Sequence, residues 1–232
     1  MGKSTYFGAG YDLDYHFNAS VDKDSLALAA LPLFDYGKEL RKSGTSSGPV
    51  VNFLIDSRRN SLNPPGGAFM AIDYRFNLDF LGSTFNWQSI FIDARKYFPF
   101  DKHRQNLLAV WSYYWAVTYG KAPYLDLPSI GWDYYNRSGR GFEQNRYRGR
   151  RLLYFESEYR RDISRNGFWG FVLFSNIHSV SEYEGNHFGY WHPAAGAGLR
   201  IKFNKISRTN IGLDFAMSKD FTGLYLSLGE AF

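Results

Sequence analysis

The sequence alternates between apolar and polar residues over many short segments, and this period of two constrains the fold more than any other feature. In residues 4–18, one face carries Phe7, Ala9, Tyr11, Leu13, Tyr15 and Phe17, and the other carries Gly8, Gly10, Asp12, Asp14, His16 and Asn18. Successive side chains of a β-strand point to opposite faces, so the pattern predicts a strand whose two faces meet different surroundings.

The same alternation predicts about ten strands separated by turn residues. The expected ranges are 4–18, 49–58, 68–80, 86–98, 105–119, 152–160, 168–181, 197–204, 210–217 and 222–232. Turn signals such as Asn166-Gly167 separate them, as expected for hairpins. We therefore predict one all-β domain over residues 1–232, built as an antiparallel up-and-down sheet.

Two features favour a transmembrane β-barrel over a soluble sandwich, whose strands also alternate. The polar faces repeatedly carry charge, whereas the apolar faces are rich in aromatic residues, which make up 19% of the chain. Short turns also alternate with long loops at 20–47, 120–149 and 182–193, as in outer-membrane barrels, whose extracellular loops are the longer ones. Lipid offers no hydrogen-bond partner to an unpaired strand edge, so we expect the sheet to close. An even number of strands would then put both termini on the periplasmic side.

The long first loop leaves the strand number open. Residues 24–42 have apolar residues at helical spacing, interrupted by Pro32, and the same segment could instead hold a hairpin that raises the number of strands to about twelve. Mean hydropathy is −0.38 and there are no cysteines. Spanning helices, disulfides and thiolate metal sites are therefore excluded.

Residues 139–151 read Gly-Arg-Gly-Phe-Glu-Gln-Asn-Arg-Tyr-Arg-Gly-Arg-Arg, between two predicted strands. This segment resembles the Arg-Gly-Phe loop signature of the BamA/TamA outer-membrane assembly superfamily, also called bacterial surface antigens. Four further segments are similar to motifs of that family in the same order. They are Asp56–Asn60 with Pro64–Gly66, Ile92–Pro99, Gly196–Arg200, and the last strand with its final Phe232.

The resemblance implies a loop clamp made of Arg140, Gly141 and Phe142 with acidic residues on the next two strands. Glu158 matches the first acidic position, whereas Asn176 replaces the second and His178 replaces a family glycine. A guanidinium can bond a carboxylate through two parallel contacts, and Asn176 can accept one further hydrogen bond. We therefore expect Arg140 to enter the lumen and pair with Glu158.

The family further implies a role in inserting or translocating other outer-membrane proteins, with Leu226, Leu228 and Phe232 as an assembly signal. Family barrels usually have sixteen strands and periplasmic POTRA domains, so this chain is a minimal member, a partial chain or one piece of an assembly. Gly8 and Gly10 in the first strand, and Gly223 and Gly229 at the last, predict a loosely paired seam that could template an incoming strand.

Other functions are weaker alternatives. A membrane anchor, a complex subunit or a narrow pore needs only the barrel, while Asp12, Asp14 and His16 on one face could form an omptin-type hydrolase or simply solvate the lumen. We expect no enzymatic activity and no cofactor. We also expect no metal, because the other histidines lack the spacing of metal ligands.

The arginines around the loop suggest partners. They are Arg137, Arg140, Arg146, Arg148, Arg150 and Arg151. Interleaved aromatics allow a nucleic-acid reader, but the flanking strands favour a lumen clamp for Arg140 and lipopolysaccharide phosphates for the outer arginines. We expect outer-membrane lipid and lipopolysaccharide as partners, other outer-membrane proteins as substrates or subunits, and no nucleic acid.

Overall fold

Ten antiparallel strands follow one another across one sheet in a computed structural model, which describes residues 4–20, 36, 40–101 and 106–232. The strands are β1 (Ser4–His16), β2 (Gly44–Asp56), β3 (Gly67–Asn77), β4 (Trp87–Pro99), β5 (Asn106–Gly120), β6 (Arg151–Asp162), β7 (Trp169–Val180), β8 (His192–Asn204), β9 (Thr209–Ser218) and β10 (Thr222–Leu228). Short 3-10 turns, η3 (Asp79–Leu81) and η4 (Tyr124–Asp126), lie in two of the connections. The predicted ten-stranded, all-β, up-and-down topology is confirmed.

Three strand boundaries differ from the prediction by four residues or more. Strand β2 begins at Gly44 and β8 at His192, each five residues earlier than expected, and β10 ends at Leu228 rather than at residue 232. Residues 44–48 are small and polar, so no alternation marks them as strand, yet they pair with β1. The helix or extra hairpin expected within 24–42 falls almost entirely outside the described residues.

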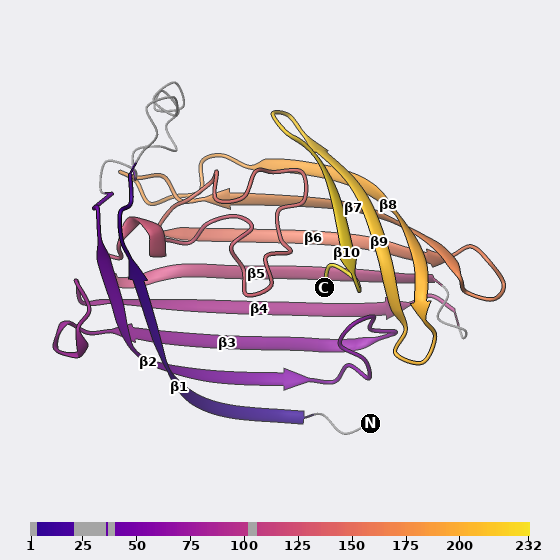
Figure 1. Cartoon of the computed structure of the whole chain (residues 1–232), viewed down its shortest axis with the longest axis horizontal. Coiled ribbons are helices and arrows are strands. Elements are labelled where there is room, and N and C mark those ends of the chain that lie inside the picture. Colours follow the sequence, from indigo (N-terminus) through magenta and orange to yellow (C-terminus); the bar gives the residue numbers. More distant parts are fainter. Residues whose placement is uncertain (1–3, 21–35, 37–39, 102–105) are drawn as a thin grey trace.

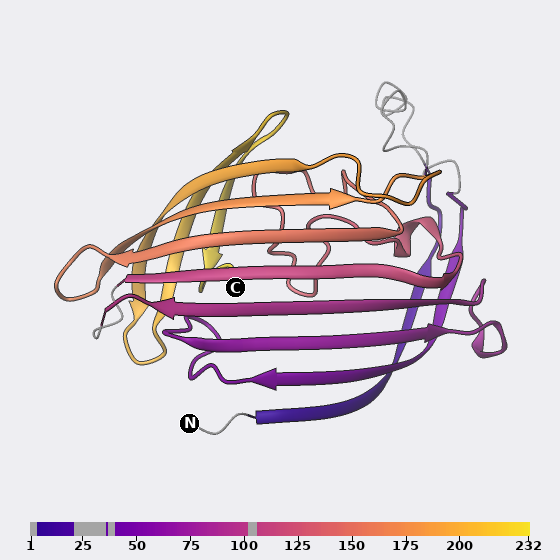
Figure 2. The ribbon, with the colours of Figure 1, turned by 180° about the vertical axis from the view of Figure 1, so that it is seen from behind.

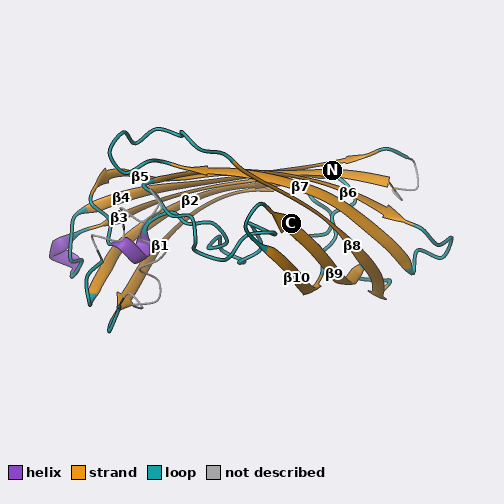
Figure 3. Ribbon diagram, turned by 90° about the horizontal axis from the view of Figure 1, so that it is seen from above, coloured by secondary structure: helices purple, strands orange, loops and turns teal. Residues whose placement is uncertain are grey.

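The sheet is strongly curved, and its two margins are β1 and β10 (Figures 1 and 2). Seen from above, it forms an arch with loops and the C-terminus beneath it (Figure 3). Among the described strands, hydrogen-bonded ladders join β1 to β2 and β10 to β9, and none joins β1 to β10. The backbone edges of β1 and β10 are therefore not paired with each other.

The two faces of the sheet differ in chemistry as the alternation predicts. The convex outer face exposes Leu173, Leu199, Leu213, Phe215, Leu224 and Leu226. The concave face, which we call the lumen, buries charged residues from β4, β6, β8 and β9, including Asp93, Glu156, Glu158, Arg200 and Asp214. Exposed aliphatic side chains point outward and buried charged ones inward, which is the arrangement of a membrane barrel rather than of a soluble sandwich.

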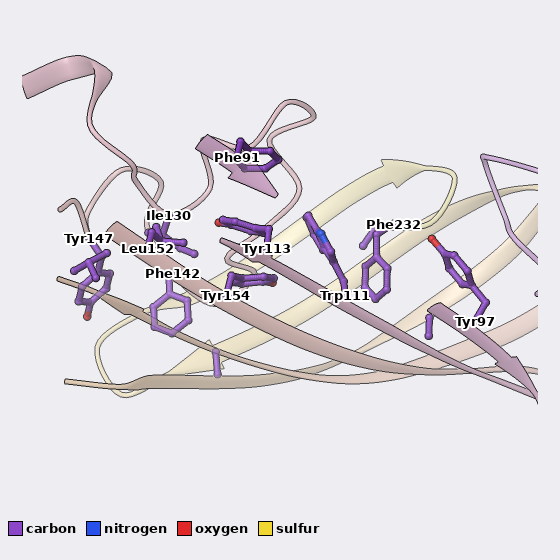
Figure 4. Packing of buried hydrophobic residues seen from close by; sticks show 14 of the residues in the cluster. Phe91, Tyr97, Trp111, Tyr113, Ile130, Phe142, Tyr147, Leu152, Tyr154 and Phe232 are labelled. Atoms are coloured by element: carbon purple, nitrogen blue, oxygen red, sulfur yellow. The ribbon is translucent and has the colours of Figure 1, made fainter. Parts of the chain in front are cut away.

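Aromatic rings fill the middle of the lumen (Figure 4). Trp111 on β5 lies 5.2 Å from the ring of Phe232 and 5.3 Å from that of Tyr154, and Tyr154 stacks on Tyr113 at 4.9 Å. The core therefore forms between the sheet and two segments that fold under it: residues 121–150 between β5 and β6, which we call the inner loop, and residues 229–232.

Strands β2 and β3 approach each other closely at Gly48, and this approach can be tested by substitution. A Cβ atom at Gly48 would lie 1.8 Å from the carbonyl oxygen of Phe76, whereas the nearest atom to a Cβ at Gly8 would be 3.8 Å away. We expect Gly48→Ala to lower the free energy of unfolding by about 1–3 kcal/mol, because the strands must separate, and Gly8→Ala to have little effect. Urea unfolding of the detergent-folded protein, followed by tryptophan fluorescence, measures both; equal stabilities would contradict the close approach.

Candidate functional site: the inner loop clamp

The inner loop is held in a fixed shape by its own hydrogen bonds. The carboxylate of Asp133 accepts bonds from the backbone N–H groups of Tyr135, Arg137 and Ser138, the last at 2.8 Å. Gly139 and Gly141 have φ angles of 75° and 92°, in the left-handed region that favours glycine. These features present the Arg140 side chain to the sheet from a tight turn.

Arg140 is the centre of the candidate site. Its guanidinium bonds Glu158 at 2.5 Å, Asp214 at 2.6 Å and also Glu156, and all four side chains are buried. The carbon of the guanidinium lies 3.5 Å from the ring centre of Phe174, a cation–π contact. One loop residue thus joins strands β6, β7 and β9.

A second layer of ion pairs surrounds this centre. Arg160 contacts Glu158 at 2.5 Å, and Arg200 bonds both Asp214 and Glu230, the latter at 2.8 Å. Charges of opposite sign therefore alternate along the lumen wall from β6 to β9. Burial alone would lower the pKa of Arg140, but the charges of Glu156, Glu158 and Asp214 outweigh it and raise that pKa well above its ordinary value.

The rest of the predicted motif lies around the same turn. The side-chain amide of Asn176 donates to the backbone carbonyl of Arg140 at 2.9 Å, so it anchors the loop backbone instead of accepting a bond from the guanidinium as expected. The N–H of Gly141 donates to the Tyr225 hydroxyl, and a Cβ there would lie 2.9 Å from that of Ala194. Phe142 packs edge-on against His178, with ring centres 4.5 Å apart.

Sequence reasoning missed much of this network. It identified Glu158 by motif, but Glu156 and Asp214 complete the shell around Arg140, and Arg160, Arg200 and Glu230 form the second layer. Their signal was present as charged residues on the polar faces of predicted strands. Which charges meet depends on the curvature that brings β6 near β9, and a single sequence does not contain it.

The predicted terminal signal is divided between the two faces. Leu226 and Leu228 are exposed on the outer face of β10, whereas Phe232 lies beyond the strand and is buried. Gly229, with a φ of 88°, turns the chain inward, and the Phe232 carbonyl accepts a bond from Arg160 at 2.8 Å. Whether these residues signal assembly stays a prediction.

The predicted seam stays a prediction, because the described ladders do not include one between β1 and β10. Gly8 and Gly10 lie on β1, Gly223 lies on β10 and Gly229 follows it, but no ladder joins these two strands in the described part of the chain. Strand β10 has seven residues against thirteen in β1, and its continuation turns into the lumen. The glycines therefore mark two separate edges.

Other classes of site find little support in the described ranges. No group of three or more His, Asp or Glu side chains there could hold a metal ion. No helix there has the length and apolar character needed to cross a membrane.

Comparison with known proteins identifies the fold. The structure is similar to the crystal structure of BamA from Haemophilus ducreyi lacking POTRA domains 1–3, with a TM-score of 0.64 and 14% sequence identity. The match covers 97% of this chain and 50% of that chain, so this chain spans about half the length of its structural neighbour. No family model and no curated protein sequence matches. The chain therefore has the fold of part of a BamA barrel.

Removing the Arg140 side chain tests the clamp. In Arg140→Ala three buried carboxylates lose their shared cation, so we expect a loss of about 3–5 kcal/mol in the free energy of unfolding and faster cleavage within 121–150. Chymotrypsin is the suitable protease, because arginine variants also remove tryptic sites. Arg146→Ala is the matched control, since Arg146 lies in the same loop and its ion pair with the exposed Glu143 is long, at 3.8 Å, so that its loss should cost little. Unchanged cleavage of the loop in Arg140→Ala would show that the clamp does not hold it.

Proposed function

We propose that the chain is an outer-membrane β-barrel protein that assists the insertion or assembly of other outer-membrane proteins. The observation that carries the proposal is the Arg140 clamp, which fixes the inner loop against the β6–β9 side of a BamA-like sheet. The first and last strands of that sheet, β1 and β10, are not paired with each other in the described structure. The BamA-like fold supports the membrane location, and the apolar outer face supplies the surface that lipid requires.

The physics of the proposed activity lies in the free strand edges. An unpaired edge presents N–H and C=O groups that an incoming strand can bond, and in lipid such groups are costly to leave without partners. Among the described residues, the clamp contacts β6, β7, β9 and, through the bond from Gly141 to Tyr225, β10, and no hydrogen bond or ion pair joins it to β1 or β2. One side of the wall is therefore held rigid while the β1 edge is free to accept a strand.

The proposed partners follow from the two surfaces of the wall. Outer-membrane lipid covers the apolar face, and lipopolysaccharide phosphates meet the arginines where the inner loop joins β6, such as Arg150 and Arg151. Substrate proteins pair with the edges. The proposal requires no bond-making chemistry and hence no enzymatic activity, cofactor or nucleic acid.

Folding kinetics test this function. An unrelated barrel protein is folded into proteoliposomes with and without this chain, and its folding is read by the heat-dependent gel shift of folded barrels. We expect faster folding, with the acceleration lost in Arg140→Ala and kept in Arg146→Ala. No acceleration by the correctly folded chain would contradict an assembly role and would favour an anchor or a subunit of a larger complex.

The membrane orientation has its own test. Leu173 lies on the outer face of β7 and is 51% exposed. If this face meets lipid, Leu173→Arg should cost about 2–4 kcal/mol and reduce folding into vesicles, whereas Glu184→Arg, in an exposed loop, should fold normally. Equal folding yields of the two variants would show that Leu173 does not face the hydrocarbon.

A further inference from the structure

A second site lies in the lumen, apart from the clamp. A cavity of about 690 Å³ separates the inner loop from the concave side of β1–β5. None of the charged residues of the Arg140 network lines it. Its walls come from the first strands and from the inner loop, so it occupies the half of the lumen that the clamp leaves open.

The cavity carries a strong excess of negative charge. Its lining includes Asp12, Asp14, Asp73, Asp126 and Asp133 against one arginine, Arg75, and one histidine, His16. Five carboxylates less one guanidinium leave a charge of −4, or −3 if His16 is protonated. The whole chain, in contrast, has a net charge of +5. The cavity therefore concentrates a potential opposite in sign to that of the protein.

Three of the carboxylates lack a close cationic partner among the described residues: Asp133, which accepts bonds from backbone N–H groups of the inner loop, and Asp12 and Asp73. Asp14 bonds Arg75, and Asp126 is 2.5 Å from His16. Asp12 is 4.0 Å from the Arg75 guanidinium, and Asp73 accepts a bond from the neutral amide of Asn52. The arrangement also explains Asp12, Asp14 and His16, which the sequence placed on one face: their partners are Arg75 and Asp126 rather than one another.

Aromatic rings form a second, independent feature of the same cavity. Trp87, Phe91 and Trp115 line it from β4 and β5, and Trp132 and Tyr134 line it from the inner loop. Phe91 meets Tyr134 edge-on at 5.1 Å, while Trp132 keeps 49% of its surface exposed. An aromatic face attracts an organic cation, and more strongly where carboxylates stand beside it.

We infer that this cavity binds an organic cation with two or more alkylammonium groups, supplied by a free polyamine or by lysine side chains of a peptide. Asp12 and Asp73 are the carboxylates that bind the ammonium groups, and Trp132 covers the alkyl chain. A neutral sugar would leave the excess charge uncompensated, and an anionic ligand would be repelled. The inference does not rest on the assembly role, because it uses side chains of β1 rather than its backbone edge, and no residue of the Arg140 clamp.

Titration of the detergent-folded chain with spermidine tests the site, by calorimetry and tryptophan fluorescence at low salt. We expect binding that weakens roughly tenfold or more in each of Asp12→Asn and Asp73→Asn, from loss of a charge-assisted hydrogen bond. Trp132→Ala should weaken it about two- to fivefold. Glu184→Gln removes a carboxylate from an exposed loop outside the cavity and should bind as the parent does. The heat-dependent gel shift verifies that each variant is folded.

A lysine-containing tripeptide, titrated in parallel, separates the two sources of the ammonium groups. Tighter binding of the tripeptide assigns the site to a peptide, and tighter binding of spermidine assigns it to a free polyamine. Failure of both probes to bind, or equal affinities in Asp12→Asn, Asp73→Asn and Glu184→Gln, would overturn the site.

Discussion

The structure depends on one buried cation, the guanidinium of Arg140. Glu156, Glu158 and Asp214 lie in the lumen with little access to water, and burying carboxylates costs several kcal/mol each unless a cation compensates them. Only the inner loop supplies that cation at the centre of the group, so the loop has to enter the lumen. Once it is inside, Phe142, Ile130 and Tyr147 complete the hydrophobic core. The electrostatic requirement of the wall thus determines where the hydrophobic core forms.

The same interaction makes the arch asymmetric. Strands β6 to β9 are joined by ion pairs through Arg140, Arg160 and Arg200, whereas β1 has β2 as its paired neighbour and is exposed along much of its length. A ladder with few buried contacts opens more easily than one tied by a buried network. We therefore expect the margin at β1 to deform more easily than the β6–β9 side of the sheet.

Features that depend on neighbouring residues could be predicted from the sequence, and contacts between distant strands could not. Alternation is local, so all ten strands could be predicted, and the errors fall where residues 44–48 and 192–196 lack it. The contact of Arg140 with Glu158 followed from a motif. Glu156 lies on the same face of β6 as Glu158, two residues away, whereas the contact with Asp214 on β9 depends on curvature accumulated over four strands. The inward turn of Phe232 depends on the φ of Gly229 and on Arg160, which the composition of a strand end does not reveal.

The lumen contains two electrostatic environments, and their difference separates structure from function. Around Arg140, three arginines and four carboxylates nearly compensate one another and hold the loop, as expected of charges whose role is folding. In the cavity beside β1, five carboxylates face one arginine. Uncompensated like charges repel and so oppose folding. A cation that binds from outside the chain would compensate these carboxylates, and this would explain why they accumulate beside exposed aromatic rings.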